Sequence, residues 1–238
     1  MKSCVSKFYG YYFARRIKNA AKFIMDLDTA QPSVLDCGCG FGSESIAFGL
    51  LGAKVFGVDL STERINVASK RLNYYKDKCA NELDVSFKNM NILDSECNDL
   101  FDIVYAKEFI THMYSISEFV KFVKRVLKSG GHLVITDANP LNPIVYYNAW
   151  RAHKDSLYTV VTNPKTGKDV PYAVERLISH FYLKSLLRQN NFESISPIFY
   201  GIPPVPFNLV SVIKLFEDKV NIPFLALYEV VSMKHSIF

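Results

Sequence analysis

Apolar and polar residues recur with two periods along the chain, one typical of helices and the other of strands. A helical spacing of three and four residues predicts an amphipathic helix from residue 8 to about 27. A Gln-Pro pair then breaks this pattern, and short apolar runs bounded by turn residues follow, which predict strands. The apolar positions of the first helix are Phe13, Ile17, Ala20, Ala21, Ile24 and Leu27.

Strand-like and helix-like segments then alternate as far as residue 137. The expected strands are 33–36, 54–58, 85–88, 101–106 and 132–137, and the expected helices are 43–51, 62–79 and 116–127. Such alternation is typical of parallel strands with helices on both faces of the sheet. The turn Ser129-Gly130-Gly131 leads from the last of these helices to its strand.

The regular pattern stops after Asp137. We expect an irregular, aromatic-rich stretch to about residue 170, a helix over 173–189 with Phe181 and Tyr182 in the core, and an extended segment over 194–199. A proline-rich loop over 203–206 would either help close a pocket or act as a rigid connector. A short helix over 209–220 and a last strand over 224–233 complete the chain.

Together these elements predict an α/β fold. We expect a doubly wound, seven-stranded, mostly parallel sheet with helices on both faces and an antiparallel last strand. The 238 residues suit a single domain over 1–238, with an N-terminal helical cap over 1–32. The irregular stretch over 138–172 is interpreted as a loop-and-helix insertion that covers the substrate or forms its wall.

Composition narrows the compartment and the partners. Apolar residues make up 49% and charged residues 21% of the chain, as in ordinary globular proteins. No run approaches the roughly 20 apolar residues that cross a bilayer, and the first residues lack the apolar core of a signal peptide. The five cysteines are odd in number and show no framework spacing. We therefore expect a cytoplasmic protein without a membrane span.

The net charge of +5 is a modest excess of basic residues. Lys121, Lys124, Arg125 and Lys128 share one face of a helix, but no aromatic stacking platform accompanies them, so a solvated surface is favoured over a nucleic-acid site. No nucleic-acid partner is expected, and the oligomeric state is left open. Cys37 and Cys39 do not form a CxxC pair, so no metal is assigned to them.

A glycine-rich segment at residues 34–43 carries the strongest chemical signal. Its sequence, VLDCGCGFGS, places three glycines where a buried strand must turn into a helix. Glycine tolerates positive φ and lets a ligand approach the backbone. The spacing Gly38-x-Gly40-x-Gly42 differs from the G-x-G-x-x-G pattern of dinucleotide sites, which counts against a pyrophosphate ligand.

Two carboxylates flank this turn. Asp59 ends the next strand, about 20 residues later, where a carboxylate can accept both hydroxyls of a ribose. Asp36, at the end of the first strand, suits a cationic amino group such as that of a methionyl tail. The two acids and the turn therefore predict an adenosine-containing cofactor.

At these residues the chain resembles the class I S-adenosylmethionine-dependent methyltransferases. VLDCGCGFGSES matches the first motif of that family, and VFGVDLS, FDIVYAKEFITHM and RVLKSGGHLVITD follow in the family's order, over roughly residues 33–137. The resemblance implies the cofactor S-adenosylmethionine. It also implies a set of cofactor-binding residues: Asp36, Gly38, Cys39, Gly40 and Gly42 toward the methionine end, Asp59 and Leu60 at the ribose, Asn91 or Ile92 at the adenine, and Lys107 beside the cofactor.

The adenine position departs from the family, which often has aspartate where this chain has Asn91. An amide oxygen can still accept from the adenine amino group, and Asp94 is an alternative counterpart.

Two roles are open for His112, which lies where the loop after the fourth strand would meet the methyl group. It can act as a general base if the acceptor is a hydroxyl, or it can support the loop. Asp137 and Asn139 could join a metal site, but a strand-end turn is favoured and no metal is assigned.

The insertion supplies the expected acceptor wall. Its aromatic and polar candidates could equally pack as a hydrophobic cluster. They are Tyr146, Tyr147, Trp150, Arg151 and His153.

The favoured function is methyl transfer to a small-molecule acceptor, with an oxygen, nitrogen or carbon acceptor left open. A methyltransferase acting on RNA or protein is an alternative, although the sequence Ala106-Lys107-Glu108-Phe109 lacks the Asn/Asp-Pro-Pro-aromatic signature of amino-methylating relatives. A nicotinamide-dependent oxidoreductase and a non-catalytic cofactor-binding protein are the other two alternatives. The glycine spacing disfavours the first, and the intact glycines and acids disfavour the second.

Overall fold

The computed structural model describes most of the chain. The described residues are 2–79, 82–94, 100–153, 156–162, 167, 169–174, 176–194, 197–201, 221 and 223–235. The predicted loop over 203–206 and the predicted helix over 209–220 lie outside them. Within the described part, no helix is both long enough and apolar enough to span a bilayer.

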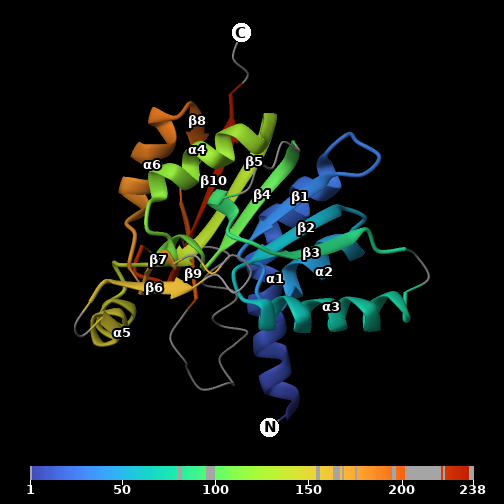
Figure 1. The fold of residues 1–238 in the computed structure, drawn as a ribbon, viewed down its shortest axis with the longest axis horizontal. Coiled ribbons are helices and arrows are strands. Elements are labelled where there is room, and N and C mark those ends of the chain that lie inside the picture. The colour runs from blue at the N-terminus through green and yellow to red at the C-terminus, as the bar shows by residue number, and fades with distance from the viewer. Residues whose placement is uncertain are drawn as a thin grey trace.

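A single twisted sheet forms the centre of the molecule (Figure 1). Five parallel strands and the antiparallel β10 lie in the order β3-β2-β1-β4-β5-β10, and β8 and β9 pair antiparallel with successive segments of β10. This confirms the predicted fold class, with the seventh position of the sheet shared by two short strands. The bounds are β1 Ser33–Cys37, β2 Lys54–Asp59, β3 Val85–Asn89, β4 Phe101–Lys107, β5 Leu127–Ala138, β8 Phe192–Ser194, β9 Ile198–Tyr200 and β10 Leu227–Lys234.

Helices cover both faces of the sheet, because neighbouring residues of each strand point to opposite sides. Val34 and Ile103 pack with α1, α2 and α3 on one face, whereas Leu35 and Val104 pack with α4 and α6 on the other. The two faces therefore hold two separate apolar clusters. The helices are α1 Lys2–Asp26, α2 Ser43–Leu50, α3 Thr62–Lys76, α4 Ile116–Val126 and α6 His180–Gln189, and the single turns are η1 Ile92–Asp94 and η2 Ile110–His112.

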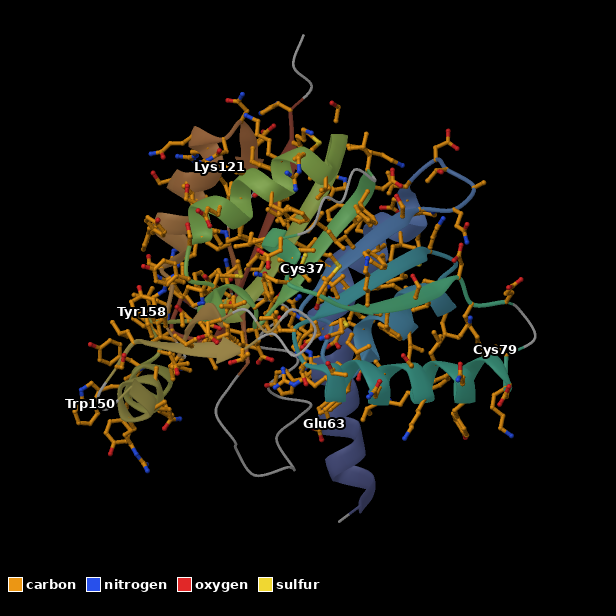
Figure 2. All side chains as sticks on the ribbon, viewed as in Figure 1. Cys37, Glu63, Cys79, Lys121, Trp150 and Tyr158 are labelled. Carbon is orange, nitrogen blue, oxygen red and sulfur yellow. The ribbon has the colours of Figure 1, made fainter. Side chains whose placement is uncertain are left out.

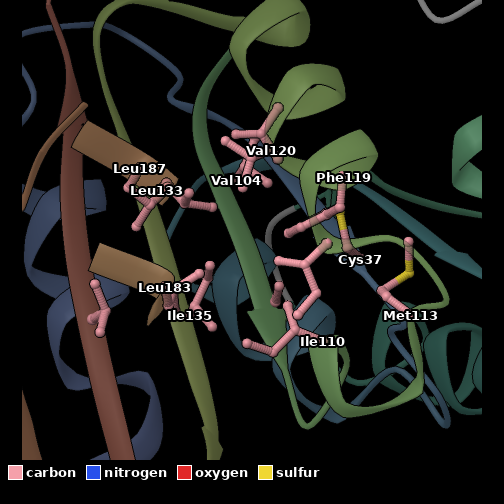
Figure 3. Close-up of a cluster of buried hydrophobic side chains, with 14 of the residues drawn as sticks. Cys37, Val104, Ile110, Met113, Phe119, Val120, Leu133, Ile135, Leu183 and Leu187 are labelled. Carbon is pink, nitrogen blue, oxygen red and sulfur yellow. The ribbon is translucent and has the colours of Figure 1, made fainter. Parts of the chain in front are cut away.

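The cluster between the sheet, α4 and α6 also supports the loop that follows β4 (Figure 3). Phe119 and Val120 of α4 are fully buried against this face, as are Leu183 and Leu187 of α6. Ile110, on the loop, is buried in the same cluster. The position of this loop is consequently fixed by the packing of the core.

The helix α6 begins at His180, seven residues later than predicted, because the Ser179 hydroxyl caps its first turn by accepting from the Phe181 N–H at 3.2 Å. The prediction that Phe181 and Tyr182 lie in the core was wrong, since they are 68% and 53% exposed. The buried face of α6 is instead formed by His180, Leu183 and Leu187.

The insertion was predicted to consist of loop and helix, and the strands that it also contains were not predicted. It contains the helix α5 (Pro143–His153) and an antiparallel hairpin of β6 (Tyr158–Thr162) and β7 (Asp169–Ala173). Asn142 caps α5 by accepting from the N–H groups of Ile144 and Val145, both at 3.0 Å. An Asn-Pro pair is thus a helix start here, although it equally suits a turn.

A buried polar row anchors α1 where the strands end at their carboxyl edge. Glu229 of β10 is 1% exposed and lies opposite Thr136 of β5, whose hydroxyl donates to it at 3.3 Å. The Asn19 amide of α1 donates to the same carboxyl group. Burial raises the pKa of Glu229 to about 7, and the hydrogen bond from Asn19 opposes that shift.

This row predicts a pH-dependent stability. A carboxyl group whose pKa is higher in the folded chain binds more protons when folded, so its contribution to stability is lost as the pH rises from about 4.5 to about 7. At pH 8, Glu229→Gln should therefore be more stable than the wild type by about 1 to 3 kcal/mol. Urea unfolding at pH 5 and pH 8 measures this, with the exposed Glu82→Gln as control. An identical loss of stability between the two pH values in wild type and Glu229→Gln would contradict the assignment.

Candidate active site

The candidate site lies at the edge of the sheet where the five parallel strands end, next to the point where the strand order reverses between β1 and β4. A cavity of about 600 Å³ adjoins a second one of about 290 Å³, and both are lined by Gly38, Arg64 and Glu108. The larger cavity is also lined by Asp59, Leu60, Asn91, Ile92, His112 and Tyr172, and the smaller by Arg16, Asp36, Cys39, Gly40, Glu44 and Lys107.

The glycine turn folds onto the end of β2. The N–H groups of Gly38 and Cys39 both donate to the Val58 carbonyl, at 2.8 and 3.0 Å, and the Gly40 N–H donates to the Asp59 carboxylate at 3.0 Å. Three successive N–H groups are therefore satisfied by β2. In a phosphate-binding turn, such groups point at the ligand instead.

Two positions in the turn require glycine. Gly38 and Gly42 both have a φ of +73°, which disfavours other residues. A Cβ atom on Gly38 would lie 2.6 Å from the Phe109 ring, and one on Gly42 would lie 2.6 Å from the Phe87 ring. The turn consequently packs tightly against aromatic rings from β3 and from the loop after β4.

The Asp59 carboxylate, at the end of β2, accepts from the glycine turn through the Gly40 N–H. It also accepts from the Ser61 N–H at 2.8 Å, and the Arg64 guanidinium lies 4.0 Å away. The side chain is 8% exposed and forms part of the wall of the larger cavity. Each carboxylate oxygen has capacity for a further hydrogen bond, which suits a ligand with two neighbouring hydroxyl groups.

Asp36 lies beneath the turn, in the wall of the smaller cavity, and is 2% exposed. Burial raises its pKa to about 7, and the hydrogen bond from the Ser45 hydroxyl, at 2.5 Å, opposes the shift. A cation bound in this cavity would favour the ionised carboxylate.

The smaller cavity is also lined by charged side chains that the sequence analysis did not assign, namely those of Arg16, Glu44, Arg64 and Glu108. Glu44 pairs with Arg16 at 3.2 Å and with Lys107 at 3.3 Å, and Lys107 also pairs with Glu108 at 3.1 Å. A buried glutamate in the first turn of α2 and an arginine on α1 have no motif of their own, so only the packing of α1 brings them together.

Glu108 has an uncommon backbone conformation at the junction of the two cavities. Its φ is +47°, in the left-handed region that disfavours residues with a Cβ atom. Its N–H donates to the Thr136 carbonyl at 2.7 Å, which holds the turn against β5. Backbone strain of this kind is concentrated at functional sites.

The predicted adenine residues line the larger cavity, but the side chain of Asn91 is engaged within its own turn. Its amide donates to Asp94 at 3.1 Å and accepts from the Leu93 N–H at 3.2 Å. Met90 and Ile92 present apolar surface on either side. A flat base would therefore meet apolar contacts together with the polar edge of Asn91 and Asp94.

His112 lies on η2 and lines the larger cavity. Its Nδ1 is 3.2 Å from the Ala173 carbonyl, and its ring stacks on Tyr172 with centroids 4.9 Å apart. Because a carbonyl can only accept, Nδ1 carries a proton here, and in the neutral ring Nε2 is then the basic nitrogen.

The wall of the larger cavity next to His112 comes from the hairpin, through Val170, Pro171 and Tyr172 of β7. Among the predicted acceptor residues of α5, the described side chains of Tyr146, Tyr147, Trp150 and Arg151 lie outside the walls of both cavities. Trp150 is 64% exposed at the outer edge of the molecule (Figure 2). Tyr147 stacks against it with ring centroids 6.0 Å apart, and Arg151 lies over Tyr147. Tyr146 is 60% exposed, and the His153 side chain lies outside the described part.

Asp137 and Asn139 are engaged by the backbone. Asp137 accepts from the N–H groups of Thr111, at 3.2 Å, and Ala138, at 2.7 Å. Burial raises its pKa to about 7. Asn139 donates to the carbonyls of Pro223 and Leu225. These contacts match a strand-end turn, and the described residues contain no group of three or more His, Cys, Asp or Glu placed to hold a metal ion.

Comparisons with known proteins agree with this geometry. Residues 35–135 match the methyltransferase domain family. The chain is 35% identical, over 175 residues, to the mitochondrial ubiquinone biosynthesis O-methyltransferase of Rattus norvegicus, covering 71% of this chain and 47% of that protein. It is 33% identical, over 106 residues, to the enzyme of the same name from Bradyrhizobium sp. (strain ORS 278), covering 44% of this chain and 40% of that protein. The chain thus spans less than half the length of these relatives.

Solved structures share the fold. A putative S-adenosylmethionine-dependent methyltransferase from Listeria monocytogenes has a TM-score of 0.61 at 22% identity, covering 94% of this chain and 98% of that one. Magnesium protoporphyrin IX methyltransferase from Synechocystis PCC 6803, with bound SAH, also has a TM-score of 0.61, at 14% identity, covering 93% of this chain and 83% of that one. With its glycine turn, its strand order and the match over residues 35–135, the chain carries a methyltransferase domain and has the fold of class I S-adenosylmethionine-dependent methyltransferases.

Proposed function

We propose that this protein transfers a methyl group from S-adenosylmethionine to a hydroxyl group of a small molecule. The observation that carries this proposal is the glycine turn, which is folded onto β2 and surrounded by carboxylates. The named function of the relatives, O-methylation, supports the choice of a hydroxyl acceptor.

The described residues fit this cofactor better than a dinucleotide. Three N–H groups of the turn are taken up by β2, which disfavours a diphosphate. The adjacent cavity combines the acids Asp36, Glu44 and Glu108 with the cations Arg16, Arg64 and Lys107, which suits a ligand that carries both signs of charge. A sulfonium and an ammonium group are cations, and both favour such surroundings. The fit therefore supports a cofactor that brings positive charge.

Individual roles follow from position. Asp36 would receive the ammonium group, and Lys107 and Arg16 would pair with the carboxylate at the same end. Asp59 would hold the ribose hydroxyls, while Leu60, Ile92 and the turn of Asn91 would surround the adenine. Gly38, Cys39, Gly40 and Gly42 would let the backbone approach the cofactor.

When bound, S-adenosylmethionine supplies an electrophilic methyl group whose transfer leaves a neutral thioether. The protein has to orient the acceptor oxygen in line with that methyl group and exclude water. His112 Nε2 would take the proton of the acceptor hydroxyl as the new oxygen–carbon bond forms. The Ala173 carbonyl, which holds the proton on Nδ1, keeps Nε2 basic.

The acceptor would lie in the part of the larger cavity lined by His112, Met113 and Tyr172. This region combines an aromatic ring with aliphatic surface, which suits a small, partly apolar molecule. The predicted acceptor contacts of α5 and the covering role of the insertion over 138–172 remain predictions. We also infer a cytoplasmic location, which the buried thiols of Cys37 and Cys39 support, and no nucleic-acid partner.

Replacement of Asp59 tests the cofactor site. Asp59→Asn removes the charge that accepts from Gly40 and from the ribose, so we expect the affinity for S-adenosylhomocysteine, the demethylated cofactor, to fall at least about tenfold. Isothermal calorimetry measures this, with the exposed Asp84→Asn as control. Wild-type affinity in Asp59→Asn would show that the ribose lies elsewhere.

Replacement of His112 tests the base. His112→Gln keeps a polar side chain but cannot take up a proton, so we expect kcat for a phenolic acceptor to fall about 100-fold while cofactor affinity is retained. Acceptors can be screened with radiolabelled methyl groups and the turnover measured at saturating cofactor. Turnover equal to that of the wild type would assign His112 to support of the loop.

A further inference from the structure

The hairpin of the insertion and the loop that carries His112 meet at several contacts, among them a backbone bridge between Met113 and Tyr172, and the side chain of Arg176 binds both segments. The loop between β4 and α4 contains only the single turn η2 as regular structure. Ile110 anchors this loop in the core, and its hairpin side is held by Tyr172 and Ala173 of β7 and by Arg176, which follows β7.

Arg176 binds the loop on both sides of His112. Its backbone N–H donates to the Thr111 carbonyl at 3.2 Å, and its Nη2 donates to the Met113 carbonyl at 2.7 Å. The Asp137 carboxyl group of β5 also accepts from the Thr111 N–H. Arg176 and Asp137 thus hold the residues on either side of His112 by hydrogen bonds.

The same guanidinium also binds the hairpin. Its Nη1 donates to the Tyr158 hydroxyl at 2.8 Å, and its carbon atom lies 5.6 Å from the centre of the Tyr158 ring. Tyr158 pairs with Ala173 across the hairpin, and Ala173 is the residue whose carbonyl accepts from His112. The planar fork of arginine suits such a bridge, because two of its donors reach partners on different segments.

Arg176 is not fully satisfied in this position. Its Nε is buried and has no hydrogen-bond partner among the described residues. An unsatisfied buried donor costs stability, so this arrangement favours a role in the site over a purely structural one.

We propose that Arg176 is a positioning residue that couples the hairpin to the candidate base. By holding both segments, it keeps the Ala173 carbonyl at His112 Nδ1 and thereby keeps the proton on that nitrogen. In the neutral ring, Nε2 is then the nitrogen that can accept a proton. This proposal rests on the function proposed for His112, and it adds a residue outside the matched domain, which ends at residue 135.

The first test observes the imidazole directly and needs no turnover. Nitrogen-labelled histidine spectra at about pH 9, where imidazoles are neutral, report which ring nitrogen carries the proton. The five histidines can be distinguished with His112→Gln. We expect the Nδ1–H form in the wild type and a shift toward the Nε2–H form in Arg176→Gln. An unchanged His112 tautomer in Arg176→Gln overturns the proposal.

Two further variants control for folding. Tyr158→Phe removes a single partner of Arg176 and keeps the ring, so it should give a smaller shift in the same direction, and it replaces Arg176→Gln if that variant does not fold. Arg188→Gln removes an exposed arginine on α6 and should leave the tautomer unchanged. A shift as large in Arg188→Gln as in Arg176→Gln would also overturn the proposal.

The second test is kinetic. Arg176→Gln should lower kcat about tenfold while leaving cofactor affinity unchanged, and it should have no further effect on kcat when His112 is already Gln. Equal effects of Arg176→Gln in both backgrounds would overturn the coupling. Wild-type turnover in His112→Gln would instead refute the base, and the tautomer measurement would still decide the role of Arg176.

Discussion

The site depends first on the hydrogen bonding between the glycine turn and the end of β2. Val58 and Asp59 take up three consecutive N–H groups of the turn, so the turn is satisfied before any ligand arrives. This leaves no cradle for phosphate and places carboxylates where a cation would bind. The hydrogen bonds between the turn and β2, rather than the glycines alone, therefore disfavour a phosphate ligand.

Segments on both sides of the glycine turn and β2 in the chain complete the site. α1 brings Arg16 to the smaller cavity, and the hairpin of β6 and β7 brings Tyr172 and the Ala173 carbonyl to His112. Both additions are held by polar contacts at the carboxyl edge of the sheet. Under the proposed function, the common core would position the cofactor, and the added segments would shape the surroundings of the acceptor.

The fold and the unit that carries the glycine turn were predictable because each rests on local signals. Alternating apolar runs defined the strands, and the glycines and Asp59 lie within one strand–turn–helix–strand unit. Arg16, Glu44 and Tyr172 were not predicted, since they meet the site only through tertiary packing. Asn142-Pro143 was interpreted as a loop because the same pair starts helices and turns. Phe181 and Tyr182 were misplaced because an aromatic residue next to a buried face can lie on either side of a helix.

The contact between Ala173 and His112 has a consequence for how such proteins diverge. A segment that shapes the acceptor cavity also supplies the hydrogen bond that orients the candidate base. An insertion exchanged between two homologues would therefore alter proton transfer together with substrate choice. Evolution of a new acceptor preference on this scaffold requires paired changes in the hairpin and in the loop after β4, and the two segments are expected to covary.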